Sequence, residues 1–109
     1  CKFSYNNLDD SLKISCKQKD ENIKDRFMID KFVFSLTGKG KIVALEIRDA
    51  SKVLSEYSLN TDVLNDIKGI ILITSVRENC LLVGLKITTS LGETNIPLRV
   101  LVPELTINN

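Results

Sequence analysis

Carboxylates and lysines are the side chains through which this chain could do chemistry, because its 109 residues include no histidine. A chain without imidazole has no Ser-His-Asp triad, no Cys-His dyad and no His-ligated zinc or haem. The best-placed carboxylates are Glu46 and Asp49, which could transfer a proton or bind a divalent ion. The simpler interpretation is that Glu46 pairs with a lysine across a sheet and that Asp49 caps a helix. We favour this interpretation and predict no catalytic residue.

Other short segments resemble ligand-binding motifs without matching them. The segment 38–41 (GKGK) lacks the spacing and the following helix of a phosphate-binding loop, so we expect a hairpin turn there. The acidic pairs Asp9–Asp10 and Asp20–Glu21 lack the repeated oxygen ligands of a calcium loop. We therefore expect no metal and no cofactor, and an enzyme that relies on carboxylates and lysine is the least favoured function.

The N-terminal region carries a modest group of lysines that could contact a nucleic acid. The group consists of Lys13, Lys17, Lys19 and Lys24. With aromatic residues nearby in the sequence, these lysines could follow a single strand whose bases stack on the rings. Acidic residues interrupt the group, however, and the whole chain carries 15 Lys plus Arg against 14 Asp plus Glu. Nucleic-acid binding is therefore the second alternative.

The cysteines and the apolar segments indicate the cellular compartment of the protein. Cys1, Cys16 and Cys80 are odd in number and widely spaced, which predicts reduced thiols rather than a disulfide framework or a zinc site. The first ten residues contain no apolar region of a signal peptide. The longest apolar runs are also far shorter than the roughly 20 residues of a membrane span. The sequence thus predicts a cytoplasmic protein.

The elements that must position these residues are mainly strands. Alternation of polar and apolar residues predicts one hairpin over 2–16 and a second around the turn at 37–40. The charged segment 17–26 is expected to be an exposed loop. The segments 27–36 and 69–76 are apolar at successive positions, which is typical of strands that are covered on both faces.

Helical spacing occurs in the middle of the chain, and strands return after it. Residues 50–57 are predicted as a short helix after the N-cap Asp49, and 62–68 as a further turn capped by Asn60 or Thr61. Strands follow at 70–76, 81–89 and 96–102. Pro97 and Pro103 cannot donate hydrogen bonds to a neighbouring strand, which makes the last strand an edge.

Together these elements predict a mainly β fold, borderline α+β, in the antiparallel order β-β-β-β-α-β-β-β. Either a curled sheet or a small sandwich with one short helical segment would have this order of elements. The length fits a single domain over residues 1–109. Residues 42–47 also resemble residues 82–87, which fits either a duplicated hairpin or the alternation that half-buried strands share.

The last predicted strand points to self-association. Four apolar residues alternate along it: Ile96, Leu98, Val100 and Val102. An apolar edge of this kind is a liability when nothing covers it. We therefore expect a homo-oligomer, most simply a two-fold dimer.

Three segments in the first half of the chain match the pattern of a known family. They are the opening strand KFSY (2–5), the acidic turn at Asp9–Asp10 and the segment GKIVALEIRDAS (40–51). Through them, residues 2 to about 57 resemble the domain of unknown function 2283 (YuzE-like), a small uncharacterised prokaryotic family. Ala44 stands where the family has glycine, and 37–39 stand where it has acidic residues. Residues 58–109 lie beyond the family pattern and are predicted only as extra β-hairpins.

The leading functional prediction is a non-catalytic interaction module, either a homo-oligomer or the partner of another small protein. The lack of a catalytic constellation in the sequence supports it. The resemblance implies the same, because some members of the family are described beside small toxin-like genes, which indicates an antitoxin-like role. Nucleic-acid binding through the lysine group and a carboxylate- and lysine-dependent enzyme are the alternatives.

Overall fold

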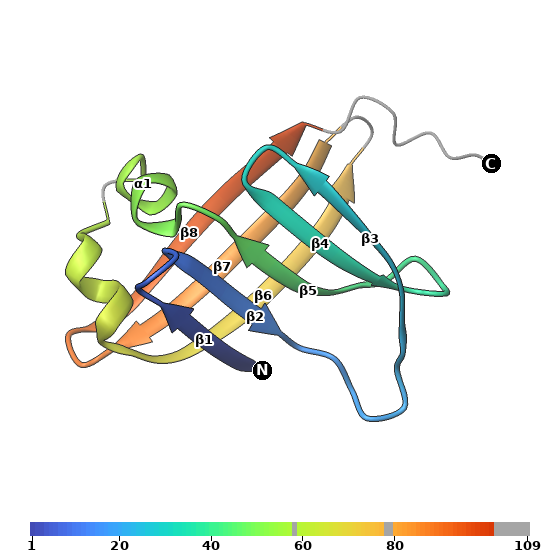
Figure 1. Cartoon of the computed structure of the whole chain (residues 1–109), viewed down its shortest axis with the longest axis horizontal. Helices are drawn as coiled ribbons and strands as arrows, with labels where there is room; N and C mark the ends of the chain where they lie inside the picture. Colours follow the sequence, from blue (N-terminus) through green and yellow to red (C-terminus); the bar gives the residue numbers. More distant parts are fainter. Residues whose placement is uncertain (58, 78–79, 102–109) are drawn as a thin grey trace.

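The computed structural model describes residues 1–57, 59–77 and 80–101 and shows a mainly β protein (Figure 1). Within these residues no helix is long and apolar enough to cross a membrane. The elements, in chain order, are β1 (Lys2–Asn6), β2 (Ser11–Ser15), β3 (Ile23–Ile29), β4 (Phe32–Thr37), β5 (Ile42–Ile47), the α-helix α1 (Ala50–Ser55), the 3₁₀-helix η1 (Thr61–Asn65), β6 (Ile67–Arg77), β7 (Cys80–Thr89) and β8 (Gly92–Leu101).

The described strands form two antiparallel sheets that pack face to face. One sheet has the order β1-β2-β5-β4-β3 and the other the order β6-β7-β8. In Figure 1 the long strands β6–β8 run diagonally across the five-stranded sheet, and α1 and η1 lie together at one end. The antiparallel, mainly β fold predicted from the sequence is confirmed, and its form is the small sandwich.

One apolar core lies between the sheets, because alternate residues of their strands point inward. Its largest buried side chains come from both sheets and from α1: Leu12, Ile14, Phe34, Leu45, Ile47, Leu54, Leu81, Leu85, Ile87 and Leu98. Phe34 also stacks on Phe27, with the ring centroids 5.0 Å apart. Both sheets and the helix therefore share a single cluster of buried residues.

The structure has one strand more before the helix than the sequence predicts. A two-residue turn, Asp30–Lys31, divides the predicted strand 27–36 into β3 and β4. Asp30 has a positive φ of 53°, which aspartate tolerates better than most residues because its short side chain bonds the local backbone. The predicted loop over 17–26 is also shorter, since β3 begins at Ile23. Charged residues fit there because β3 is an edge strand with one face in solvent.

Strand β6 is buried on one face only, which contradicts the prediction of a doubly covered strand over 69–76. Ile70 belongs to the core, whereas its neighbours Ile71 and Ile73 are exposed. The reason is that no described element covers the outer face of the three-stranded sheet. The apolar run therefore predicted the strand correctly, but it wrongly predicted that both faces of the strand are covered.

The cap of α1 is a different aspartate from the one predicted. Asp49 occupies the N-cap position, but its φ is 51° and its side chain makes no capping hydrogen bond. Its carboxylate instead lies 2.8 Å from Nζ of Lys31. The capping carboxylate comes from Asp10, in the turn between β1 and β2. Both of its oxygens accept from the backbone N–H of Ser51, at 3.1 and 3.2 Å, and one accepts from the Ser51 hydroxyl at 2.6 Å.

Two further bonds tie the same turn to its surroundings. The backbone N–H of Ala50 donates to the carbonyl oxygen of Asp10 at 2.9 Å. The Tyr5 hydroxyl donates to Oδ1 of Asp10 at 2.6 Å. The first hairpin and the start of α1 are therefore joined across 41 residues of sequence.

The second predicted helical turn is present in a shorter form. Asn60 caps it as predicted, since its side chain accepts a hydrogen bond from the N–H of Asp62 at 3.0 Å. The turn is 3₁₀ and ends at Asn65, so Ile67 begins β6 rather than continuing a helix.

Cys1 and Cys16 form a disulfide, which contradicts the prediction of reduced thiols for these two residues. The pairing of β1 with β2 sets Lys2 opposite Ser15, so the next pair outward brings the two cysteines together with Cα atoms 4.2 Å apart. The odd count in the sequence is explained by Cys80, whose side chain lies outside the described part of the structure.

Replacement of Asp10 by asparagine should lower the free energy of unfolding by about 1–2 kcal/mol, because the helix start loses a capping oxygen and a negative charge. Asparagine tolerates the φ of 54° at this position, so the variant tests the carboxylate and not the backbone. Denaturant unfolding measures the change. The control is Asp49→Asn, which removes an exposed ion pair and should cost less than about 1 kcal/mol. Equal losses would contradict the assignment of Asp10 as the cap.

Reduction of the disulfide should lower the free energy of unfolding by up to about 3 kcal/mol, because the bond closes a loop between residues 15 apart in sequence. The measurement is denaturant unfolding with and without a thiol reductant. In the Cys16→Ser variant the starting stability should already be reduced, and the reductant should have no further effect. An unchanged unfolding midpoint of the wild type under reduction would argue against the bond.

Candidate functional site

A groove on the outer face of the five-stranded sheet brings polar side chains together. It has a volume of about 610 Å³ and is lined by residues of all five strands. Four of its residues are cations, namely Lys2, Lys13, Arg26 and Arg48, and one is a carboxylate, Glu46. All four cations are exposed to solvent. We call this site the cationic groove.

The strand register explains why the surface is hollow there. One row across the sheet reads Lys2, Ser15, Ala44, Ser35 and Arg26, from β1 to β3. Its three central side chains are small and form the floor, while the long cations stand at both ends. Nε of Arg26 donates to Oγ of Ser35 at 3.3 Å, so the guanidinium lies against the floor rather than pointing away from the sheet.

The two carboxylates that the sequence nominated for acid–base work are not brought together in one site. Glu46 lines the cationic groove, where its Oε2 lies 3.5 Å from Nε of Arg48. Lys13 is its cross-strand neighbour by register, but the ion pair is with the arginine two residues along. Asp49 is not among the groove residues and pairs with Lys31. Among the described residues, no three Cys, Asp or Glu side chains gather as metal ligands would.

The structure separates the four lysines of the predicted nucleic-acid region. Lys13 lies in the cationic groove on β2, whereas Lys24 is on β3, beyond β5 and β4 in the sheet. Lys24 lines a smaller hollow of about 370 Å³ with Lys39 and Lys41. Lys19 is exposed in the loop before β3. The four residues therefore do not form one continuous patch.

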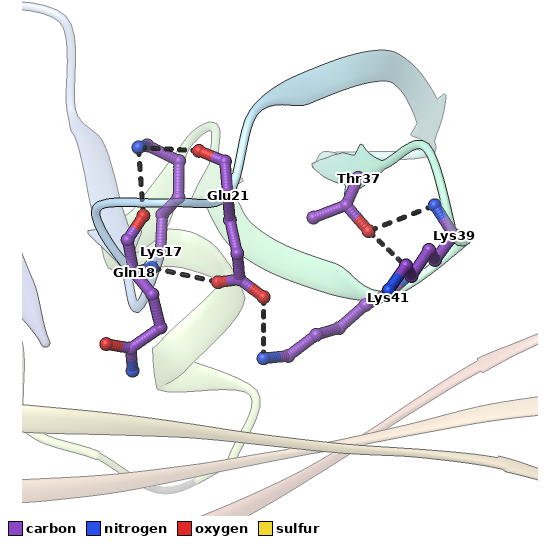
Figure 2. Close-up of polar contacts among 6 residues, drawn as sticks. All are labelled: Lys17, Gln18, Glu21, Thr37, Lys39 and Lys41. Carbon is purple, nitrogen blue, oxygen red and sulfur yellow. Dashed lines mark hydrogen bonds and ion pairs between the residues drawn. The ribbon is translucent and has the colours of Figure 1, made fainter.

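Lys17 is engaged within its own loop (Figure 2). Its Nζ donates to the carbonyl oxygens of Gln18 and Glu21, at 3.2 and 2.9 Å. The Glu21 carboxylate accepts from the N–H of Gln18 and from Nζ of Lys41, both at 2.8 Å. The bond from Lys41 is the main reason why the pKa of Glu21 lies below its usual range. These contacts fix the loop against the turn after β4 and leave Lys17 less available to a ligand.

The predicted oligomer strand is an edge among the described strands, but its two described apolar side chains point inward. Strand β8 pairs only with β7 among the described strands. Ile96 and Leu98 are 3% and 1% exposed and belong to the core, so they cannot contact a second molecule. The Val100 side chain and Val102 lie outside what the structure describes.

An exposed apolar surface lies instead on the outer face of the three-stranded sheet. By register, Ile73 of β6 faces Gly84 of β7, which faces Pro97 of β8. With Ile71 these residues form what we call the apolar face. Because Gly84 has no side chain, a hollow of about 390 Å³ lies between Ile73 and Pro97. This surface was not predicted from the sequence. The signal for it is that Gly84 and Lys86 alternate with buried residues of β7, which indicates that the outer face of the sheet is exposed.

The polar cluster around Asp10 has the strongest electrostatic perturbation and is structural. The hydrogen bond from the Tyr5 hydroxyl to Asp10, together with burial, raises the pKa of Tyr5 to about 12. Burial on its own would raise the pKa of Asp10, but hydrogen bonds from Ser51 and Tyr5 outweigh it and lower that pKa. The carboxylate therefore stabilises the fold above pH 3.8, and this contribution is lost as the pH falls through the lower folded pKa.

The pKa of Tyr5 can be measured directly, because the chain has only 2 tyrosines. In the Tyr57→Phe variant the phenolate absorbance should rise with a midpoint of about 12 instead of 10.0, since ionisation of Tyr5 would break its bond to Asp10. The bond thus stabilises the fold below pH 10.0 and is lost as the pH rises toward 12. Adding Asp10→Asn should move the midpoint down toward 10.0. A midpoint near 10.0 in the folded Tyr57→Phe protein, monitored by circular dichroism, would rule out the bond.

Comparisons with known proteins give no relative for this arrangement. No family model matches the chain, no curated protein matches it, and no solved structure matches it. The resemblance of residues 2 to about 57 to the domain of unknown function 2283 therefore stays a prediction from the quoted segments.

Proposed function

We propose that the protein is a non-catalytic interaction module that forms a homodimer through its apolar face. The observation that carries this proposal is the exposure of two neighbouring isoleucines on an uncovered sheet. Ile71 is 49% exposed and Ile73 is 57% exposed, each on the side of β6 that points away from the core. Exposed apolar surface of this kind, bordered by polar residues, is typical of protein–protein contacts.

The shape of the apolar face suits a second copy of the same chain. It carries a projection, formed by the two isoleucine side chains, beside a hollow over Gly84. In a two-fold dimer each copy presents the same patch, so the projection of one copy can fill the hollow of the other. Each filled hollow removes apolar surface from water, so both contacts stabilise the dimer.

The charges around the apolar face also permit self-association. Lys86 lies opposite Ile71 at the border of the hollow, and its Nζ is 3.5 Å from Oε2 of Glu93. Because the rim carries both signs, two copies can dock without bringing only like charges together. A partner of strong net charge would gain little from this surface.

Pairing along the edge of β8 is the less favourable route to a dimer. Pro97 lies in the middle of that strand and has no N–H to donate. A second strand added there would leave one of its carbonyl groups without a donor. The proposal therefore moves the predicted self-association from the edge of the sheet to its face.

The size of the apolar face sets the expected strength. The apolar face spans three strands spaced about 4.8 Å apart and about three residues along them, which is roughly 140 Å². A standard stable interface buries about 800 Å² on each partner. We therefore expect a weak dimer whose fraction depends on protein concentration.

The predicted antitoxin-like role belongs to the same proposal, since it requires a protein partner and no catalytic group. The two alternative functions expected from the sequence, nucleic-acid binding and catalysis, are not supported by the positions of their residues. The lysine group does not form a continuous nucleic-acid patch, and Glu46 and Asp49 do not share a site. The cytoplasmic location predicted from the sequence also fits poorly with the bond between Cys1 and Cys16, because disulfides persist mainly in oxidising compartments.

Replacing Ile73 by lysine should abolish the dimer, because it would bury a charge in the contact. Sedimentation velocity over a range of protein concentrations should show a monomer–dimer equilibrium for the wild type and only monomer for the variant. Since Ile73 is exposed, the fold should be unaffected. The matched control is Leu91→Lys at the turn between β7 and β8, where the leucine is 92% exposed, and it should dimerise like the wild type. A wild type that stays monomeric at every concentration would refute the proposal.

A further inference from the structure

We propose that the cationic groove binds an extended acidic peptide segment of a partner protein. This surface lies on the opposite sheet from the apolar face and is chemically different from it. The inference therefore does not depend on the proposed dimer, and each can fail alone.

Positive charge is concentrated in the groove far beyond the average of the chain. Four cations and one carboxylate line it, whereas the whole chain has a net charge of +1. Charges of one sign in a concave surface reinforce one another and attract the opposite charge from solution. The groove is thus suited to an anion.

Three of the four groove cations form no ion pair among the described residues, unlike several lysines elsewhere on the surface. Lys31, Lys41, Lys68 and Lys86 each have a carboxylate within 4 Å. Of the groove cations, Arg48 pairs with Glu46. Lys2, Lys13 and Arg26 form no ion pair within the described residues. An acidic ligand could pair with these three side chains without first displacing an internal carboxylate.

The spacing of the cations selects an elongated ligand. Lys2 and Arg26 stand at the two ends of a register row that crosses all five strands. Four strand spacings of about 4.8 Å place their backbones about 19 Å apart, which an extended peptide spans with about six residues. A single phosphate or carboxylate could reach only one end. A chain with acidic side chains near both ends could reach both.

The floor between the cations favours a peptide over a nucleic acid. Ser15 and Ser35 offer hydroxyl groups, and Val33 and Ile23 add apolar contacts at the sides. Single-stranded nucleic acids are usually held by aromatic side chains on which the bases stack. Phe3, the one aromatic residue at the groove, is half-buried and packs against the core. An aromatic platform is therefore missing from the groove.

Fluorescence anisotropy can test the proposal with three labelled probes. They are an acidic peptide of about eight alternating Asp and Ser residues, a matched Asn and Ser peptide, and oligothymidylate of similar length. At low salt the acidic peptide should bind and the neutral peptide should not, and added salt should weaken the binding. The double variant Lys13→Glu, Arg26→Glu should reduce the affinity for the acidic peptide at least tenfold.

Two controls separate the groove from the general charge of the protein and from the dimer. Lys19→Glu, Lys39→Glu makes the same change in net charge at two exposed lysines outside the groove, and it should retain most of the affinity. The Ile73→Lys variant should bind the acidic peptide as the wild type does, whether or not the wild type dimerises. An equal loss in the two charge-reversal variants, or no binding of the acidic peptide, would overturn the proposal. Tighter binding of oligothymidylate than of the peptide would replace it with a nucleic-acid site.

Discussion

The hydrogen bonds of Asp10 hold together two parts of the chain on which the fold depends. Its carboxylate caps α1, and its backbone carbonyl accepts from the residue that begins that helix. The helix in turn places Leu54 and Ala50 in the core at one end of the sandwich. Without this link, the turn between β1 and β2 would have only local bonds. The first hairpin carries one side of the cationic groove, so the link positions groove residues as well as core residues.

The sandwich presents two outer faces of opposite character. One is concave and cationic, and the other carries exposed isoleucines around a glycine. In a dimer formed through the apolar faces, the two grooves would point away from each other. Such a dimer could link two partner molecules, but a single short ligand could not span both grooves and gain from avidity.

Local patterns were enough to predict most of the strands and the cap of η1. Alternation in β2, β5 and β7 and the capping by Asn60 depend on residues close in sequence. The turn at Asp30–Lys31 was missed because Asp30 is its single usual turn residue and stands within a mainly apolar segment. The Asp10 cap and the disulfide were missed because their partners meet only once the strands are paired. The cationic groove was missed as well, because Arg26 is brought to it only by the order of all five strands.

Three aspartates with positive φ, at positions 10, 30 and 49, limit the set of sequences that can adopt this fold. Asp30 and Asp49 have in common a backbone conformation that glycine or asparagine could also adopt. Asp10 has a second requirement, because its carboxylate caps a helix and accepts from Tyr5. Glycine and asparagine would keep the conformation and lose the charge, whereas glutamate would keep the charge at the cost of a strained backbone. Aspartate is the one natural residue that meets both requirements, so this position has the narrowest choice of the three.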